Sequence, residues 1–154
     1  MSEYTWEQVV EAKVGCIFVD RFDEGLRFLI MRGPFHLCAY IGIPMDHPLA
    51  KRNYDDLPID CHGGLTFAGE GRKRGEWPAG FYWYGWDYGH CDDYMISDHH
   101  SVDYARFNES RTKWGVKEVD DNSWHALYQF KRLMRLVESV ANEAKLSTLA
   151  AISK

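Results

Sequence analysis

An apolar repeat near the C-terminus constrains the fold more than any other feature of this sequence. Apolar residues recur there at alternating steps of three and four, which is the spacing of one face of an α-helix. These residues are Leu127, Phe130, Met134, Val137, Ala141 and Ala144. Leu133, Leu136 and Val140 widen the stripe, which is typical of a helix that lies across a sheet. The sequence therefore predicts a long C-terminal helix, capped within residues 121–123 and packed on a β-sheet.

Five apolar runs rich in β-prone residues precede this helix along the chain. Residues 16–22, 26–31 and 35–43 are separated by two turn sequences, Asp-Glu-Gly and Arg-Gly-Pro. This arrangement predicts an antiparallel meander of three strands. Residues 61–67 and 81–87 predict two further strands. Over residues 90–121 the composition is polar with no clear period, and we expect long irregular structure that lies over the sheet.

The start of the chain carries the signature of a helix N-terminus. Thr5 and Gln8 have the spacing of a capping box, which predicts a short helix over about residues 6–14, closed by Gly15. The chain has 154 residues, of which 45% are hydrophobic, and this suits one packed domain over residues 1–154. We therefore expect an α+β fold. Its single, mainly antiparallel sheet of about five strands should carry a short N-terminal helix and a long C-terminal helix packed on it.

Charge and cysteine content argue against several classes of protein. The chain carries 18 Lys and Arg against 23 Asp and Glu, with a net charge of -5. General nucleic-acid binding is not expected, because no overall basic field is available for phosphates. No apolar run approaches the roughly 20 residues of a membrane span and no signal peptide is recognisable, so we expect a cytosolic protein. The four cysteines form no CxxC pair and predict reduced, mostly buried thiols.

The two late strands carry the most informative side chains. Because side chains alternate along a strand, we expect His62 and Thr66 on one face of residues 61–67, away from the core. Residues 81–87 are aromatic on both faces, which predicts a central strand or a covered cleft. The Gly-Gly pair after His62 indicates a bulge or a close approach by a ligand or another segment. A simple packing or twist requirement is the alternative.

A turn at the end of the last strand is the best candidate for a functional site. Asp87, His90 and Asp93 place two carboxylates and an imidazole within it, and His90 and Asp93 are the candidate catalytic residues. His62, Asp87 and His90 would form a ligand set for a divalent metal such as zinc, iron or manganese. Acid or base catalysis by His90, oriented by Asp87, needs the same atoms without a metal. A structural turn, in which the carboxylates accept backbone amides, is the third interpretation.

Other polar clusters are weaker candidates. Residues 72–74, Arg-Lys-Arg, form a local basic hook for phosphate or simply a solvated loop. Residues 98–100, Asp-His-His, are interpreted as a solvated loop. Two cysteines adjoin histidines in the sequence, but a nucleophilic cysteine needs a base across space rather than along the chain. Buried cysteine is therefore the preferred interpretation.

Four short motifs follow one another in the central region of the chain. They are Tyr-Ile-Gly-Ile-Pro at residues 40–44, His-Pro-Leu at 47–49, Cys-His-Gly-Gly-Leu-Thr-Phe at 61–67 and Gly-Trp-Asp-Tyr-Gly-His at 85–90, with Asp93 following. In these motifs the chain resembles a group of small uncharacterised phage and prophage proteins, over roughly residues 37–94. The group has no settled activity, so the resemblance implies a phage setting and no catalytic roles.

A phage setting favours a protein that works by binding. We expect a phage-type accessory protein that presents an acidic surface to a host protein or holds a small nucleotide-like ligand. Such a protein would act in counter-defence, as an inhibitor of a host factor such as CRISPR or by sequestering a nucleotide signal. The predicted pocket consists of His62, Thr66, Trp83, Asp87, His90 and Asp93.

Two other functions fit the same residues. The first is a metal-dependent hydrolase that acts on a nucleotide-like or phosphorylated substrate. In it His62, Asp87 and His90 would hold the metal, and Asp93 would position or deprotonate water. The second is a structural component of a virion.

Overall fold

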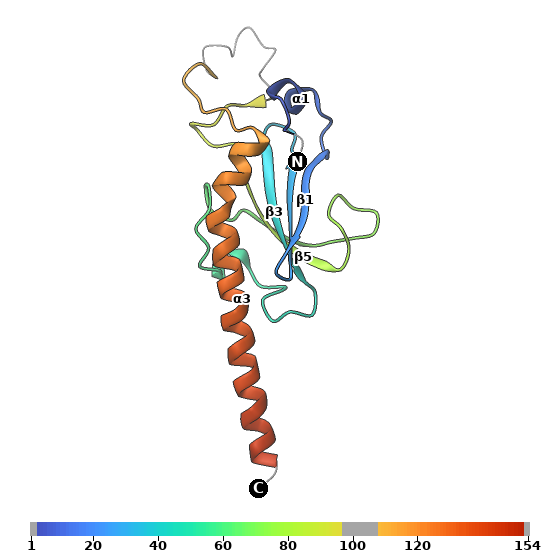
Figure 1. Cartoon of the computed structure of the whole chain (residues 1–154), viewed down its shortest axis with the longest axis vertical. Coiled ribbons are helices and arrows are strands. Elements are labelled where there is room, and N and C mark those ends of the chain that lie inside the picture. The colour runs from blue at the N-terminus through green and yellow to red at the C-terminus, as the bar shows by residue number, and fades with distance from the viewer. Residues whose placement is uncertain (1–2, 97–107, 153–154) are drawn as a thin grey trace.

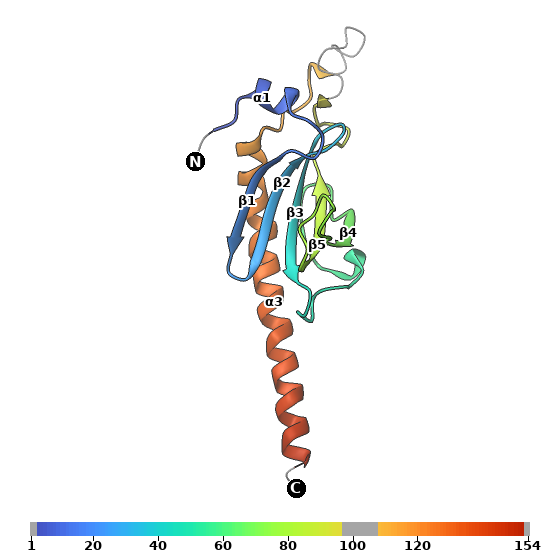
Figure 2. The ribbon, with the colours of Figure 1, turned by 90° about the vertical axis from the view of Figure 1, so that its right-hand side faces the viewer.

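The computed structural model describes residues 3–96 and 108–152 of the chain. These residues form a five-stranded antiparallel sheet that packs against a long helix (Figures 1 and 2). The elements in chain order are α1 (Trp6–Glu11), β1 (Ile17–Asp23), β2 (Leu26–Arg32), β3 (Leu37–Pro44), the 3-10 helix η1 (Tyr54–Asp56), β4 (Phe67–Glu70), β5 (Phe81–Asp87) and α3 (Val116–Ile152). The predicted α+β class is confirmed, with five strands and the two expected helices.

The sheet has the strand order β1-β2-β3-β5-β4, so the meander is followed by a strand that skips one place. The β1–β2 hairpin closes between Asp23 and Leu26. Glu24 and Gly25 form its two-residue turn with φ of 47° and 86°, as a turn matched to the twist of the strands requires. Strand β5 lies between β3 and β4, which confirms its prediction as a central strand.

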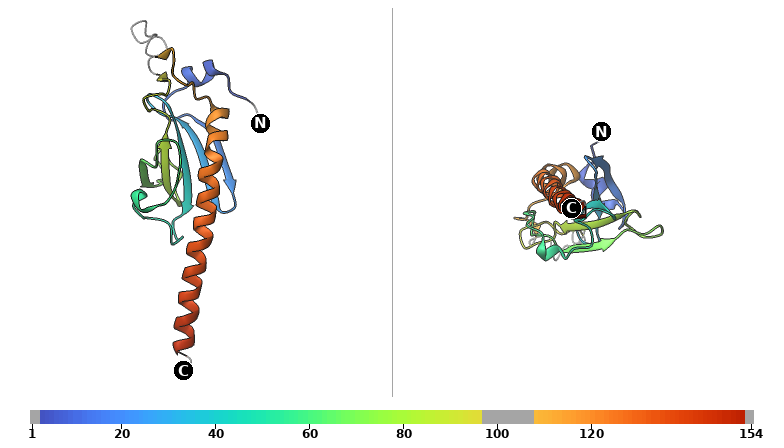
Figure 3. Two further views of the ribbon diagram at one scale, coloured as in Figure 1. Left: turned by 90° about the vertical axis from the view of Figure 1, so that its left-hand side faces the viewer. Right: turned by 90° about the horizontal axis from the view of Figure 1, so that it is seen from below.

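Both faces of the sheet are covered, and the covering differs between them. Helix α3 lies across one face, where Phe130 packs with Phe28 and Tyr84 in the main core (Figure 3). On the opposite face a smaller apolar cluster forms around the fully buried Trp83. Trp77, from the loop after β4, closes this second cluster.

The capping box and the long helix are both present, with shifted boundaries. The Thr5 hydroxyl accepts from the backbone N–H of Gln8, and the short helix ends at Glu11 rather than near residue 14. Helix α3 begins at Val116, so residues 121–123 lie inside it and the predicted cap is wrong. Of these residues, Asn122 accepts from the Tyr88 hydroxyl at 2.8 Å, whereas the buried Ser123 donates to the carbonyl of Val119 in the same helix at 2.6 Å.

The predicted strand over residues 61–67 is wrong except at its last residue. Gly63 and Gly64 have φ of 71° and 79°, in the left-handed region that a strand does not use. The backbone N–H of Gly64 donates to the carbonyl of Cys61 at 2.9 Å, which closes a turn. Strand β4 therefore begins only at Phe67, and alternation along a strand does not apply to His62.

The described residues of the polar segment after residue 90 lie at one end of the sheet, beside α1 and the start of α3 (Figures 1 and 2). Over its described residues this segment therefore does not cover a face of the sheet as expected, and residues 116–121 belong to α3. A single parallel bridge joins Asp93 to Thr112. This bridge brings the chain back from the end of β5 toward α3.

Helix α3 extends well beyond the sheet (Figure 2). Its buried positions end at Met134, and residues 138–152 are exposed. The predicted apolar stripe therefore covers the sheet only along its first turns. Among the described residues, no helix combines the length and the hydropathy that a membrane span needs.

An ion pair attaches the start of α3 to the edge of the sheet. Asp120 accepts two hydrogen bonds from the guanidinium of Arg21 in β1, at 2.7 and 2.8 Å, and the Asp120 side chain is largely buried. Lys117 and Asp121, one turn apart on the same helix, form an exposed pair at 3.4 Å. The two pairs differ in burial and in geometry, and so in their expected contribution to stability.

We predict that Asp120→Ala lowers the free energy of unfolding by about 2 kcal/mol, because it leaves the Arg21 guanidinium without its bidentate partner. Asp121→Ala is the matched control and should change it by less than about 0.5 kcal/mol. Urea denaturation followed by circular dichroism measures both values. Equal losses in the two variants would contradict the role assigned to the Arg21 pair.

Candidate functional site

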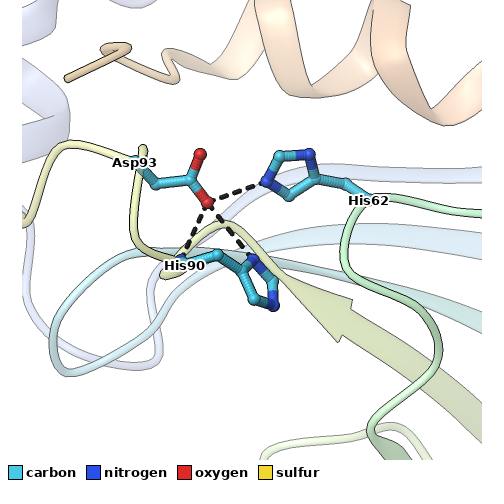
Figure 4. A group of neighbouring side chains, drawn as sticks. All are labelled: His62, His90 and Asp93. Carbon is cyan, nitrogen blue, oxygen red and sulfur yellow. Dashed lines mark hydrogen bonds and ion pairs between the residues drawn. The ribbon is translucent and has the colours of Figure 1, made fainter.

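The predicted site residues meet where β5 ends. Asp87 is the last residue of β5, and the following chain turns back so that the N–H of Asp93 donates to the carbonyl of His90 at 2.9 Å. The turn that contains His62 lies beside it (Figure 4). Two segments that are separate in sequence are thus brought together, as the site hypothesis requires.

Asp93 is the centre of the cluster. Its Oδ2 accepts from Nε2 of His62 at 2.8 Å, from Nδ1 of His90 at 3.3 Å and from the backbone N–H of His90 at 2.9 Å (Figure 4). One ligand atom from each of the three side chains lies within 4.8 Å of the others. This spacing is compatible with three ligands around one metal ion.

The environment of Asp93 favours its ionised form. The side chain is only 3% exposed, and burial raises the pKa of Asp93. The hydrogen bonds from His62, from the His90 backbone and from Trp114 lower the pKa by more, so that it lies below its usual value. Trp114 contributes by donating from Nε1 to the second oxygen, Oδ1, at 2.8 Å. Asp93 is therefore a buried carboxylate with both oxygens engaged.

Aromatic rings hold the imidazole of His62 in place. It stacks on Tyr88, with ring centroids 4.6 Å apart and an angle of 12°, and its edge meets Trp114 at 4.9 Å. The Tyr88 hydroxyl accepts from Trp86 Nε1 at 3.0 Å and donates to Asn122 of α3 at 2.8 Å. Helix α3 and β5 therefore both determine the orientation of His62.

Gly63 allows the two histidines to approach. A Cβ atom at this position would overlap the imidazole ring of His90, whereas one at Gly64 would meet nothing within 4 Å. Gly63 thus allows a close approach by another chain segment, which is one of the interpretations that the sequence left open. No side chain fits at Gly63 unless His90 moves.

Asp87 lies next to the cluster of His62, His90 and Asp93 but does not belong to it. Its Oδ1 is 3.7 Å from Nε2 of His90 and 4.0 Å from Nε2 of His36. Thr66 donates to its Oδ2 at 3.4 Å, and the N–H of Gly89 donates to its Oδ1 at 3.1 Å. The three side chains whose possible ligand atoms lie together are therefore His62, His90 and Asp93, and Asp87 of the predicted set lies outside this group. The turn after β5 folds Asp93 back onto His90.

Trp83 lies apart from the other predicted pocket residues. It is fully buried in the second apolar cluster, together with Tyr40 and Met31, and its Nε1 donates to the carbonyl of Pro78 at 3.0 Å. Alternation along β5 placed Trp83 and Asp87 on one face, but the site forms beyond the end of the strand. Trp83 is accordingly a core residue of that face.

Two of the cysteines, Cys38 and Cys61, have the properties of structural thiols. Burial raises the pKa of Cys38 to about 11 and that of Cys61 to about 12. Both thiols are therefore protonated at neutral pH, which suits a structural role. All four cysteines are free, but only Cys38 is buried, Cys61 is half-buried, and Cys16 and Cys91 are exposed, so the expectation of mostly buried thiols is wrong. The Asp-His-His cluster at residues 98–100 lies outside the described residues.

Sequence reasoning did not identify three residues that shape the site. His36 precedes β3 and approaches Asp87, and its ring would overlap any side chain at Gly89. Trp114 and Tyr88 fix Asp93 and His62, as described above. The aromatic run of β5, which continues at Tyr88, was a usable signal, whereas nothing in the sequence around Trp114 points to Asp93.

The arrangement supports two kinds of chemistry. Two imidazoles and one carboxylate can bind a divalent transition metal and leave positions for water. Without a metal, the same groups form a hydrogen-bonded His-Asp-His array in which a histidine can exchange protons with a bound molecule. His62 and His90 have side chains 23% and 39% exposed, so solvent reaches the cluster from their side.

Comparison with known proteins adds no relative. No protein-family model, no curated protein and no solved structure matches the chain. The phage setting therefore stays a prediction, and any function has to be inferred from the site itself.

We predict that Gly63→Ala moves the His90 ring and that Gly64→Ala does not. Both variants should lose about 1 kcal/mol of stability, because alanine is strained at positive φ. Only Gly63→Ala adds a methyl group where His90 lies. Nitrogen-15 spectra of the imidazole rings report the position of His90 directly. Equal changes of the His90 resonances in the two variants would contradict the proposed close approach.

Proposed function

We propose that the protein binds one divalent transition metal ion through His62, His90 and Asp93. The observation that carries this proposal is the convergence of three ligand atoms within 4.8 Å from two separate segments. Nitrogen and carboxylate ligands suit zinc, iron or manganese, and three protein ligands are the usual number in a catalytic site. One negative charge in the set leaves the bound ion with a net positive charge.

Residues around the cluster also support a metal site, because they are placed to orient the ligands. Carboxylate ligands are commonly fixed by a hydrogen bond to the oxygen that faces away from the metal, and Trp114 donates to Asp93 in this way. Histidine ligands commonly present their other ring nitrogen to a carboxylate, and Asp87 lies 3.7 Å from Nε2 of His90. Two of the three ligands, Asp93 and His90, thus already have partners that would orient them.

We further propose that the site catalyses hydrolysis. A bound metal ion would supply Lewis-acid activation of water, and the exposed side of the two histidines gives a substrate access to it. Asp87 is the residue assigned to accept the proton from water, because it is half-buried next to His90 and is not needed as a ligand. This assignment replaces Asp93, which this proposal uses as a metal ligand. The substrate class remains that of the sequence prediction, a nucleotide-like or phosphorylated compound.

We predict that untagged protein, purified without chelators, contains close to one equivalent of a transition metal by elemental analysis. His90→Ala and Asp93→Asn should lose it, because each removes one of only three ligands. The matched control is His125→Ala, which removes an exposed histidine of α3 outside the cluster.

A second readout keeps this test independent of folding. Cobalt added to the metal-free protein should give the absorption bands of a coordinated ion, and circular dichroism should show each variant folded. Folded wild-type protein that binds neither zinc nor cobalt would refute the metal site. Equal metal content in His90→Ala and wild type would refute the ligand assignment.

We predict that Asp87→Asn retains the metal but lowers the hydrolysis of p-nitrophenyl phosphate or bis(p-nitrophenyl) phosphate by about 100-fold or more, as loss of a general base does. Asp92→Asn, an exposed neighbour in the same turn, should keep wild-type activity. A metal-loaded wild type without activity on either ester would contradict hydrolysis of simple phosphoesters. Unchanged activity in Asp87→Asn would contradict the role of Asp87.

A role as a phage-type accessory protein in counter-defence is our second proposal. The resemblance in the central motifs supports it, and so does the outward face of α3, where Trp124 and Tyr128 are 57% and 61% exposed. Large exposed aromatic side chains are typical of surfaces that bind other proteins. In this proposal the ligand cluster would stabilise the fold rather than carry out a reaction.

A further inference from the structure

Strand β1 is an edge of the sheet, and among the described residues it pairs only with β2. In an antiparallel pair, residues alternate between those bonded to the neighbour and those that point away. Counted from the two-residue turn at Glu24 and Gly25, Asp20 and Phe22 direct their N–H and C=O groups to the outer side. A β-bulge before Val19 limits the regular edge to the rest of the strand. An unpaired edge of this kind is a template for a further strand.

A groove of about 340 Å³ lies beside this edge, between β1, the N-terminal segment and the first turns of α3. Its apolar lining consists of Tyr4, Phe18, Val19 and Val116. Phe18 is the residue without a partner at the bulge, and its ring meets that of Tyr4 edge-on at 5.0 Å. The groove has room for an apolar side chain of a strand placed against β1.

The polar lining of the groove is mainly negative. It consists of four carboxylates and one ammonium group, those of Glu3, Glu118, Asp120, Asp121 and Lys117. Arg21 neutralises Asp120, and Lys117 lies 3.4 Å from Asp121. The excess of negative charge favours a basic occupant.

Helix α3 continues the wall of the groove along β1. Lys117, Asp121, Trp124 and Tyr128 follow one another at steps of four, three and four, which places them on one face of the helix. The guanidinium of Arg21 lies 5.8 Å from the centre of the Trp124 ring, so this ring already faces a cation beside β1. A second cation from a bound chain would find exposed aromatic surface here.

We propose that a basic, extended segment of a partner protein binds along the outer edge of β1 and adds a strand to the sheet. Its backbone pairs with Asp20 and Phe22, an apolar side chain enters the groove, and its lysines or arginines meet Glu118, Asp121 and Trp124. A second copy of this chain is disfavoured as the occupant, because each copy carries a net charge of -5. This surface shares no residue with the metal site, so the two proposals stand or fall separately.

The test uses the full chain and a fluorescent, end-capped octapeptide of alternating lysine and valine at physiological ionic strength. Fluorescence anisotropy should show saturable binding. A peptide of the same sequence with N-methyl groups along one edge should bind at least about tenfold more weakly, since it cannot complete the backbone pairing. An octapeptide of alternating glutamate and valine should not bind.

Two further readouts locate the peptide on the molecule. Amide hydrogen exchange should slow at Asp20 and Phe22, the outward N–H groups, and stay unchanged at Arg21. Trp124→Ala should weaken binding about fivefold, the usual size of a cation–π contact. Leu146→Ala, which removes an equally exposed side chain from the same helix, is the matched control and should leave binding unchanged.

Each contrary result overturns the proposal. Equal binding of the N-methylated peptide would show simple attraction of positive charge to an acidic surface. Equal effects of Trp124→Ala and Leu146→Ala would place the peptide elsewhere. A dimer in sedimentation experiments without peptide, in which the amides of Asp20 and Phe22 are already protected, would make a second copy the occupant.

Discussion

Strand β5 has to be covered on both of its faces, and much of the structure follows from this constraint. Its residues alternate large aromatic side chains, so that Tyr84 and Trp86 face α3 while Trp83 faces the loop after β4. Burying rings of this size removes more apolar surface from water than any other residue type can. A strand with two buried faces belongs inside a sheet, and β3 and β4 accordingly flank it. The site lies where this buried strand reaches its end, so its geometry is fixed by the packing of the core.

The elements with a regular period were predictable from the sequence, and the irregular ones were not. Strand β5 and the three-stranded meander follow from alternation and turn residues, because each has a face that must be buried. The segment around His62 contains β-prone residues as well, but its two glycines adopt positive φ, and composition does not reveal that choice. The start of α3 was missed for a related reason. Asn122 and Ser123 resemble capping residues in the sequence, while in the fold Asn122 accepts from the Tyr88 hydroxyl and Ser123 donates to the carbonyl of Val119 inside the helix.

Most of the candidate site was also predictable, although the roles of its residues were not. His62, Asp87, His90 and Asp93 do come together, in a row that includes His36. Along this row imidazoles and carboxylates alternate, from His36 through Asp87, His90 and Asp93 to His62. Asp87 and Asp93 are both three residues from His90, so sequence spacing does not distinguish their roles. Burial separates them, because Asp93 accepts hydrogen bonds from two segments and from Trp114, whereas Asp87 stays at the solvent side.

The part of α3 that extends beyond the sheet is not stabilised by packing on the core, unlike the rest of the helix. Residues 138–152, which span about 22 Å, have exposed side chains, so backbone hydrogen bonds and intrinsic helix propensity carry most of their stability. Glu138, at the start of this section, also pairs with His47 at 2.8 Å. Unfolding of this section does not require disruption of the core. We therefore expect this section to open at a lower free energy than the section packed on the sheet, without loss of the sheet.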